Sequence, residues 1–156
     1  MPALSTQPDN PAVAEALVRE VEAAAERLLA RDPSDVAERP APNKWSDIEI
    51  VGHLIDSAVN NHQRFVRVQT SDAVAFPGYE QDEWVERQEY RGALWTDIVG
   101  LWRLYNVHLA RVIAAIPDDT LERRITVGTS EPMTVSFAVE DYLAHLRHHL
   151  QQLGAV

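Results

Sequence analysis

The stretch from residue 141 to residue 152, close to the C-terminal end of the chain, reads DYLAHLRHHLQQ. Three of the six histidines of the protein lie in it, at His145, His148 and His149. His145 and His149 are four residues apart, so on an α-helix their side chains project from one face about one turn apart. Two neutral imidazoles at this spacing can bind one transition-metal ion. The stretch therefore predicts a helix that carries part of a metal site and needs a further ligand from elsewhere in the chain.

The apolar residues of this predicted helix indicate which histidines face the protein interior. They form one arc of the helical wheel: Val139, Tyr142, Leu143, Leu146, Leu150 and Leu153. His149 lies closer to this arc than His148 does, because successive residues are rotated by about 100°. We therefore expect His145 and His149 to form the ligand pair and His148 to lie at its edge. Gln152 is placed to face the same site.

Length and composition are those of one globular domain. The chain has 156 residues, of which 46% are hydrophobic, enough for a sizeable core. Residues 1–10 are polar and rich in proline, and we expect a flexible N-terminus there. Residues 11–156 are expected to form a single domain.

Charge and cysteine content narrow the classes of function. The formal net charge is −10, which argues against nucleic acid or an anionic membrane as partner because both attract an excess of Lys and Arg. The protein has no cysteine, so thiolate nucleophiles and cysteine-ligated zinc are excluded, whereas a histidine site remains open. No signal peptide and no apolar run of about 18–20 residues is apparent. We therefore expect a cytoplasmic protein.

Hydrophobic periodicity predicts four long amphipathic helices, over residues 11–31, 46–69, 96–116 and from 136 onward. The start of the second is marked by a capping box, with Ser46 as the N-cap and Glu49 three residues later. A short helical piece is expected at 82–88 in the long connection before the third helix. Residues 122–135 alternate weakly and suggest a small hairpin before the last helix. The predicted fold class is all-α, a four-helix bundle.

The third metal ligand is expected from the second helix. His53 begins a polar stripe there, which continues with Asp56, Ser57, Asn60 and Arg64. On a helical wheel this stripe lies almost opposite the apolar residues of the helix, so one interpretation is that it faces water. The alternative is that it faces a polar cavity while the apolar side packs on neighbouring helices. The pattern alone leaves both open.

The remaining histidines and the absent motifs limit the alternatives. His62 falls on the apolar side of the second helix and is interpreted as a structural histidine, while His108 lies off the seam of the third helix. The chain contains no GxSxG, no glycine-rich phosphate loop and no HExxH motif. Glu49 precedes His53 by four residues rather than three, so the Glu-x-x-His pairs of di-iron bundles are missing as well. A mononuclear site fits better.

Several of these motifs together resemble the DinB/YfiT-like superfamily, and within it the metal-dependent hydrolase branch. The resemblance extends from the first helix to the C-terminus. It rests on the segments 43–46 (NKWS), 52–56 (GHLID), 61–65 (NHQRF), 77–79 (PGY) and 145–153 (HLRHHLQQL). It implies an up-down-down-up four-helix bundle, often dimeric, and one divalent metal ion, commonly nickel or zinc. The residues that match the ligands of the family are His53, His145 and His149.

The resemblance implies two chemistries on a small-molecule substrate. One is metal-dependent hydrolysis, and the other is transfer dependent on a low-molecular-weight thiol, since the chain has no thiol of its own. Three imidazoles leave coordination positions open for water or substrate. Asp56 and Asn60, one and two turns after His53, are predicted to orient ligands or move a proton. The alternative is a non-catalytic metal- or ligand-binding bundle, and in either case we expect a homodimer.

Overall fold

The computed structural model describes residues 9–71 and 73–156 of the chain. Its four long helices are α1 (Asn10–Leu29), α2 (Asp47–Arg67), α4 (Trp95–Ala114) and α5 (Val135–Gln152). The shorter elements are α3 (Gln81–Arg87), the strands β1 (Ala73–Phe76), β2 (Arg124–Val127) and β3 (Met133–Thr134), and the single 3₁₀ turns η1 (Val68–Thr70), η2 (Tyr90–Gly92) and η3 (Asp118–Thr120). The prediction of a four-helix bundle is confirmed. The expected flexible N-terminus lies outside the described residues up to residue 8, whereas Asp9 caps α1 and Asn10 is buried within it.

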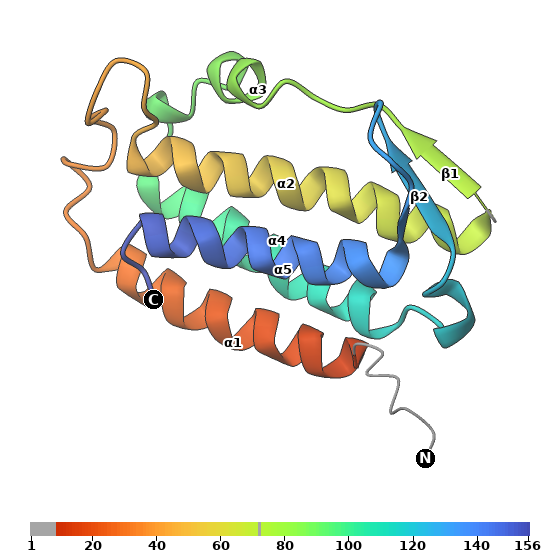
Figure 1. The fold of residues 1–156 in the computed structure, drawn as a ribbon. Coiled ribbons are helices and arrows are strands. Elements are labelled where there is room, and N and C mark those ends of the chain that lie inside the picture. Colours follow the sequence, from red (N-terminus) through yellow and green to blue (C-terminus); the bar gives the residue numbers. More distant parts are fainter. Residues whose placement is uncertain (1–8, 72) are drawn as a thin grey trace.

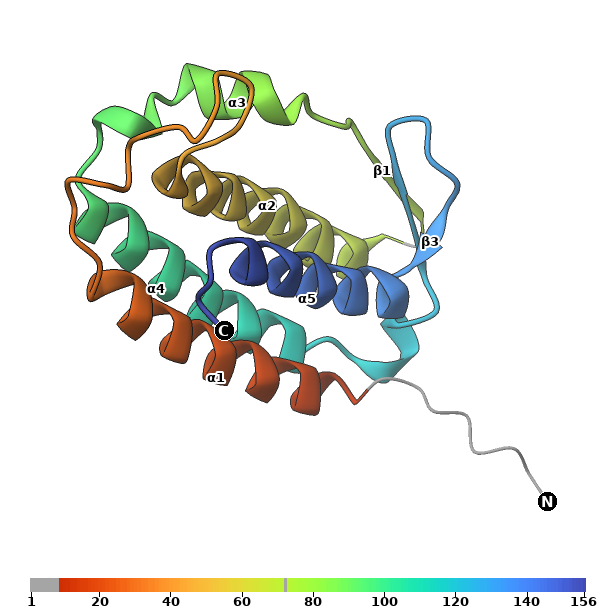
Figure 2. The same cartoon turned by 60° about the vertical axis from the view of Figure 1, so that its left-hand side comes forward.

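The bundle has an up-down-down-up order, which the family resemblance implied. In Figure 1, α1 and α5 run in one direction, and α2 and α4 run in the other. Helix α4 packs against both α1 and α2, and α5 also contacts both of them. Figure 2 shows the four helices around a common core. Because α2 and α4 are parallel, the chain must travel the full length of the bundle between them, and this return path shapes the site.

The start of α2 is fixed by the predicted capping box. The carboxylate of Glu49 accepts hydrogen bonds from the backbone N–H of Ser46 at 2.9 Å and from its hydroxyl at 3.0 Å. Arg39 adds a paired contact from the preceding loop, with its Nη2 2.6 Å and its Nε 2.9 Å from the two oxygens of Glu49. These contacts fix the first turn of α2 six residues before His53, so they set the position of the site.

A three-stranded sheet closes one end of the bundle. β2 pairs antiparallel with β3, which confirms the predicted hairpin before the last helix. β1 pairs with β2 in parallel, with Val74 opposite Ile125, and this strand was not predicted. The guanidinium of Arg123, next to β2, donates to the carbonyl oxygens of Val68 and Gln69 in η1, directly after α2. The sheet is thereby joined to the C-terminal end of α2.

The return path covers the outer side of α2, and this decides the question that the helical wheel left open. After β1 the chain crosses above α2 through α3 and η2 before α4 begins (Figure 1). As a result, every residue of α2 from Ile48 to Ala58 is buried. The interpretation that the polar stripe faces water is wrong for His53, Asp56 and Ser57, and Asn60 and Arg64 are half-buried.

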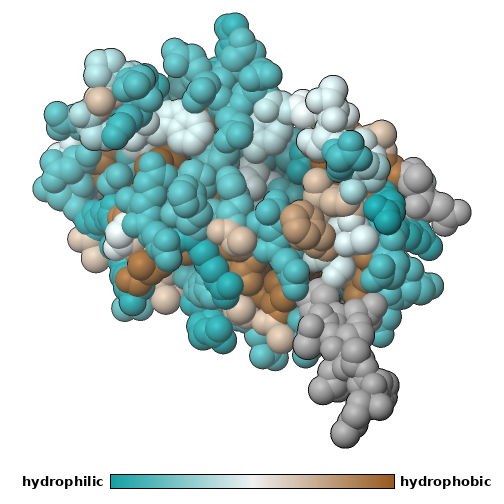
Figure 3. Space-filling view, viewed as in Figure 1, coloured by the Kyte–Doolittle hydropathy of each residue, from teal (hydrophilic) through white to brown (hydrophobic). Residues whose placement is uncertain are grey.

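The face of the protein that Figure 3 presents is mainly hydrophilic, with hydrophobic side chains exposed in small areas. Among the residues that the structure describes, no helix combines the length and the apolar character needed to cross a membrane.

Candidate metal centre

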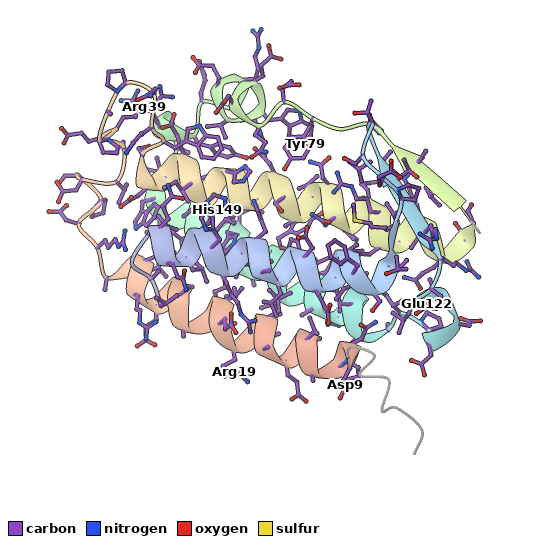
Figure 4. All side chains as sticks on the ribbon, in the orientation of Figure 1. Asp9, Arg19, Arg39, Tyr79, Glu122 and His149 are labelled. Atoms are coloured by element: carbon purple, nitrogen blue, oxygen red, sulfur yellow. The ribbon has the colours of Figure 1, made fainter. Side chains whose placement is uncertain are left out.

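Three histidines from two helices meet between α2 and α5. His53 comes from the buried first half of α2, and His145 and His149 come from successive turns of α5. Each of the three offers one ring nitrogen, and these nitrogens all lie within 4.8 Å of one another. The Nε2 atoms of His53 and His145 are 3.2 Å apart. Figure 4 shows His149 between α5 and α2.

The spacing of these nitrogens fits one bound ion. Nitrogens held at about 2.0–2.1 Å from a tetrahedral ion lie about 3.3 Å apart, close to the 3.2 Å between the Nε2 atoms of His53 and His145. Within the described residues these three histidines are the group that meets the requirements of a metal site. The set predicted from the sequence is therefore brought together, and it can hold a divalent metal.

The surroundings keep the imidazoles in the neutral form that a metal ligand needs. Burial, reinforced by the other two histidines, lowers the pKa of His53 to about 3. Burial and the neighbouring His149 lower the pKa of His145 to about 4. Burial also lowers the pKa of His149. The three rings are therefore unprotonated at neutral pH, with lone pairs free for a cation.

A residue beyond the histidines fixes the orientation of one ring. Nδ1 of His149 is 2.8 Å from Oε1 of Gln152, and because an amide oxygen only accepts, Nδ1 carries the proton. Nε2 of His149 is left with its lone pair, as an outer hydrogen bond to a metal-binding histidine typically arranges. Gln152 therefore contacts the histidine cluster through His149. His148 is exposed, which agrees with its predicted place at the edge.

On the side away from the other two histidines, His53 is held by packing. The indole of Trp45 lies against its ring, with centroids 4.7 Å apart. Its Nδ1 is buried and has no hydrogen-bond partner among the described residues. Trp45 thus closes one side of the site and excludes water from the ring of His53.

Asp56 lies one turn after His53 and is bound to the crossing segment. Its Oδ1 accepts hydrogen bonds from the hydroxyl of Tyr90 at 2.7 Å and from Nε2 of Gln88 at 2.8 Å. Its Oδ2 is buried and has no partner in the part of the chain that the structure describes. Burial raises the pKa of this carboxyl although both hydrogen bonds oppose that change. The ring of Tyr90 rests directly on Gly52, where any Cβ would overlap it.

A cavity of about 230 Å³ opens beside the histidines, between α2, α5 and the sheet. His53 and His145 form part of its wall, and Arg64, Tyr79 and Asp141 are among the polar residues that line the remainder. Its volume is below the roughly 300–1,000 Å³ typical of sites for drug-sized ligands, so it suits a small molecule.

Other predicted residues lie outside this cavity. The side-chain amide of Asn60 donates to the backbone carbonyl of Asp56 at 2.8 Å, and Asn60 borders a neighbouring hollow. Asp56 itself is covered by Tyr90 and does not line the cavity. The catalytic roles of Asp56 and Asn60 therefore stay predictions. His62 is half-buried and lies 2.6 Å from the hydroxyl of Tyr105, and its ring contacts that of the exposed His108, away from the metal centre.

Sequence reasoning did not assign a role in the site to Trp45, Tyr79 or Tyr90. Tyr79 and Tyr90 belong to the crossing segment, and Figure 4 shows Tyr79 on that segment above α2. The PGY and NKWS segments were connected with the site only as parts of a resemblance. A glycine at position 52 in a helix interior was the one local signal that another part of the chain approaches closely there.

Comparison with known proteins gives the family. The sequence matches the DinB superfamily over residues 13–153, and the chain belongs to this superfamily. Its structure is similar to that of YfiT from Bacillus subtilis, a protein described as "a probable metal-dependent hydrolase with an unusual four-helix bundle topology". The TM-score is 0.82 at 18% sequence identity, covering 99% of this chain and 92% of the other. No curated protein matches this sequence.

Proposed function

We propose that this protein is a metal-dependent hydrolase that acts on a small molecule, with His53, His145 and His149 as the ligands of one divalent ion. The observation that supports this proposal most directly is the convergence of three neutral imidazoles at the wall of a cavity. The description of YfiT as a probable metal-dependent hydrolase agrees with it. Nickel and zinc are the proposed ions, since both accept imidazole nitrogen readily.

The chain and the ion have separate tasks in this proposal. The ion, when bound, supplies a Lewis acid that polarises a substrate carbonyl and activates water. Trp45 and the crossing segment exclude bulk water from the inner side of the site, and Gln152 holds His149 in the tautomer that binds metal. Asp56 has a pKa raised by burial and an Oδ2 without a partner among the described residues. Because it does not line the cavity, we propose that it accepts a proton through one water molecule.

The thiol-dependent reaction is the second chemistry to be tested. The protein contains no cysteine, so any thiol must come from a small cofactor that enters the cavity together with the substrate. The limited volume of about 230 Å³ favours hydrolysis, which needs room for one organic molecule only. A homodimer also remains our proposal, and sedimentation analysis of the full chain tests it.

The test is a panel of small esters, amides and lactones, assayed with nickel- or zinc-loaded protein in the presence and absence of a millimolar thiol. We expect turnover without thiol that stops on chelation, returns when the ion is added back, and is missing in His145→Ala. Turnover that requires the thiol would favour the transferase. A protein that binds one ion and turns over no substrate under any condition would favour the non-catalytic alternative.

The variant Asp56→Asn separates catalysis from metal binding. Asparagine retains an oxygen that can accept from Tyr90, but it cannot take up a proton. We expect unchanged metal content and a loss of turnover of about 10²-fold or more. Unchanged turnover would exclude Asp56 as the base.

A further inference from the structure

We propose that Arg64 binds the carboxylate of the substrate, so that the substrates are small, elongated monocarboxylates whose reacting group lies several bonds from the acid. This inference rests on the proposed function and specifies the substrate class for the same site. Arg64 lines the cavity that also contains His53 and His145. One molecule in this cavity can therefore contact the metal ligands and the guanidinium.

The side chain of Arg64 lacks the partners that other covered arginines have. Arg39 and Arg31, which are also half-buried, each pair with a carboxylate at 2.6–2.7 Å. Arg64 is half-buried, and among residues 9–71 and 73–156 no carboxylate pairs with it and no group accepts a hydrogen bond from its side chain. A partly desolvated cation without a partner is unfavourable unless a ligand supplies the missing negative charge.

The cavity around Arg64 offers further neutral groups for an anion. Tyr79, Ser57 and Asn61 line it as well. Burial raises the pKa of Tyr79, so its hydroxyl remains a donor at neutral pH. The amide of Asn61 already donates to the backbone carbonyl of Ser57 at 2.9 Å, which leaves Arg64 and Tyr79 as the principal donors.

Charge on the opposite wall selects a monoanion. Asp141, on α5, lines the same cavity, and the protein as a whole carries a formal charge of −10. Both repel a phosphate dianion more strongly than a carboxylate monoanion, and the planar carboxylate matches the guanidinium with two parallel hydrogen bonds. We therefore assign a carboxylate rather than a phosphate to Arg64.

Helix geometry gives the length of the substrate. Arg64 follows His53 by eleven residues on one helix, which separates their Cα atoms by about 16 Å. Side chains on a helix lean toward its N-terminus, so Arg64 extends back toward His53 and shortens that span. The acid group and the reacting group are consequently separated by several bonds, which distinguishes these substrates from short α-substituted acids.

The experiment is an NMR titration of the metal-loaded full chain with benzoate and with the neutral isostere benzamide, and with acetate, propionate and inorganic phosphate as further probes. It is carried out on the wild type, Arg64→Gln, Arg64→Lys and the control Arg67→Gln. Arg67 is exposed one turn further along α2 and does not line the cavity, so its substitution removes the same charge outside the site. Metal content is measured on every sample, and the titration is repeated after chelation, so that direct binding of benzoate to the ion is separated from binding to Arg64.

We expect wild type and Arg67→Gln to bind benzoate in preference to benzamide, with or without metal. Arg64→Gln should lose about tenfold or more in benzoate affinity, the usual effect of removing a charged hydrogen-bond partner. Arg64→Lys should recover part of it, because the charge remains without the planar geometry. Equal benzoate binding by Arg64→Gln and wild type would overturn the proposal. It would also be overturned if wild type bound none of benzoate, acetate and propionate, or if wild type bound inorganic phosphate more tightly than these carboxylates.

These results also distinguish the two proposals. If metal content and hydrolysis are retained but benzoate binding is independent of Arg64, the substrate class is wrong and the proposed function stands. If no sample binds metal but benzoate binding still depends on Arg64, the anion site stands and the proposed function fails.

Discussion

Gly52 is the position where one methyl group should disturb the metal centre without touching a ligand. It lies in α2 directly before His53, and a Cβ there would overlap the ring of Tyr90. Gly52→Ala must therefore displace Tyr90, whose hydroxyl donates to Asp56 at 2.7 Å. An exposed helical Gly→Ala change would instead stabilise the protein by about 1 kcal/mol.

The expected magnitude follows from three contributions. Overpacking costs about 1–3 kcal/mol, and the lost hydrogen bond to a carboxylate costs about 1.5–3 kcal/mol. The gain in helix propensity offsets about 1 kcal/mol, so the net destabilisation is about 1.5–5 kcal/mol. For a chain of this size that lowers Tm by roughly 3–20 °C.

Thermal and urea denaturation of the metal-free protein measure this change, with Gly100→Ala as the matched control. Gly100 is also in a long helix, α4, but a Cβ there meets nothing within 4 Å. Gly100→Ala should be neutral or stabilising. In a Tyr90→Ala background the overlap is removed, so Gly52→Ala should no longer destabilise. The reasoning is refuted if Gly52→Ala is as stable as Gly100→Ala in the wild-type background.

Two further predictions concern stability. The pKa of His53 in the folded protein is about 3, below that of a histidine in the unfolded chain. As the pH falls, the unfolded state therefore takes up this proton before the folded state does. The metal-free protein consequently loses stability as the pH falls from about 6.5 toward 4. The free energy of unfolding, measured by urea denaturation, should fall between pH 7 and pH 4.5 by about 2–3 kcal/mol more in the exposed-site control His148→Gln than in His53→Gln. Equal falls in the two variants would contradict this. In Arg39→Ala the buried Glu49 keeps only Ser46 as a partner. Because Arg39 holds the pKa of Glu49 low against the effect of burial, this change should lower the free energy of unfolding by about 2–3 kcal/mol. The exposed pair is the comparison: Arg103→Ala, which frees Glu22, should cost less than about 1 kcal/mol, and similar costs for both variants would refute the distinction.

The bundle could be predicted from the sequence because its signals are local. Helical periodicity and the capping box at Ser46 and Glu49 depend on residues within a few positions of one another. The pair His145 and His149 was found for the same reason. The strand β1 was missed because its four residues, AVAF, have no clear alternation and gain their partner from residues about fifty positions later.

The burial of His53 could not be predicted from the helical wheel. A wheel assumes one buried side, but α2 is buried on both sides because the parallel course of α2 and α4 forces the chain back across it (Figure 1). The contact of Tyr90 with Gly52 and the position of Arg64 in the cavity wall depend on that crossing as well. The sequence pattern indicated His53 as the third ligand but left open whether it faces water, and only the resemblance to a known family decided that question from the sequence.

Elemental analysis of metal content tests the central claim most directly. Untagged wild type, His53→Ala, His145→Ala and His149→Ala are reconstituted with nickel or zinc and dialysed, with His148→Ala as control. His148 lies next to His149 in sequence but is exposed and outside the ligand group. The account predicts about one ion per chain in wild type and His148→Ala, and a strong loss in the other three. Equal metal content in all five proteins would contradict it.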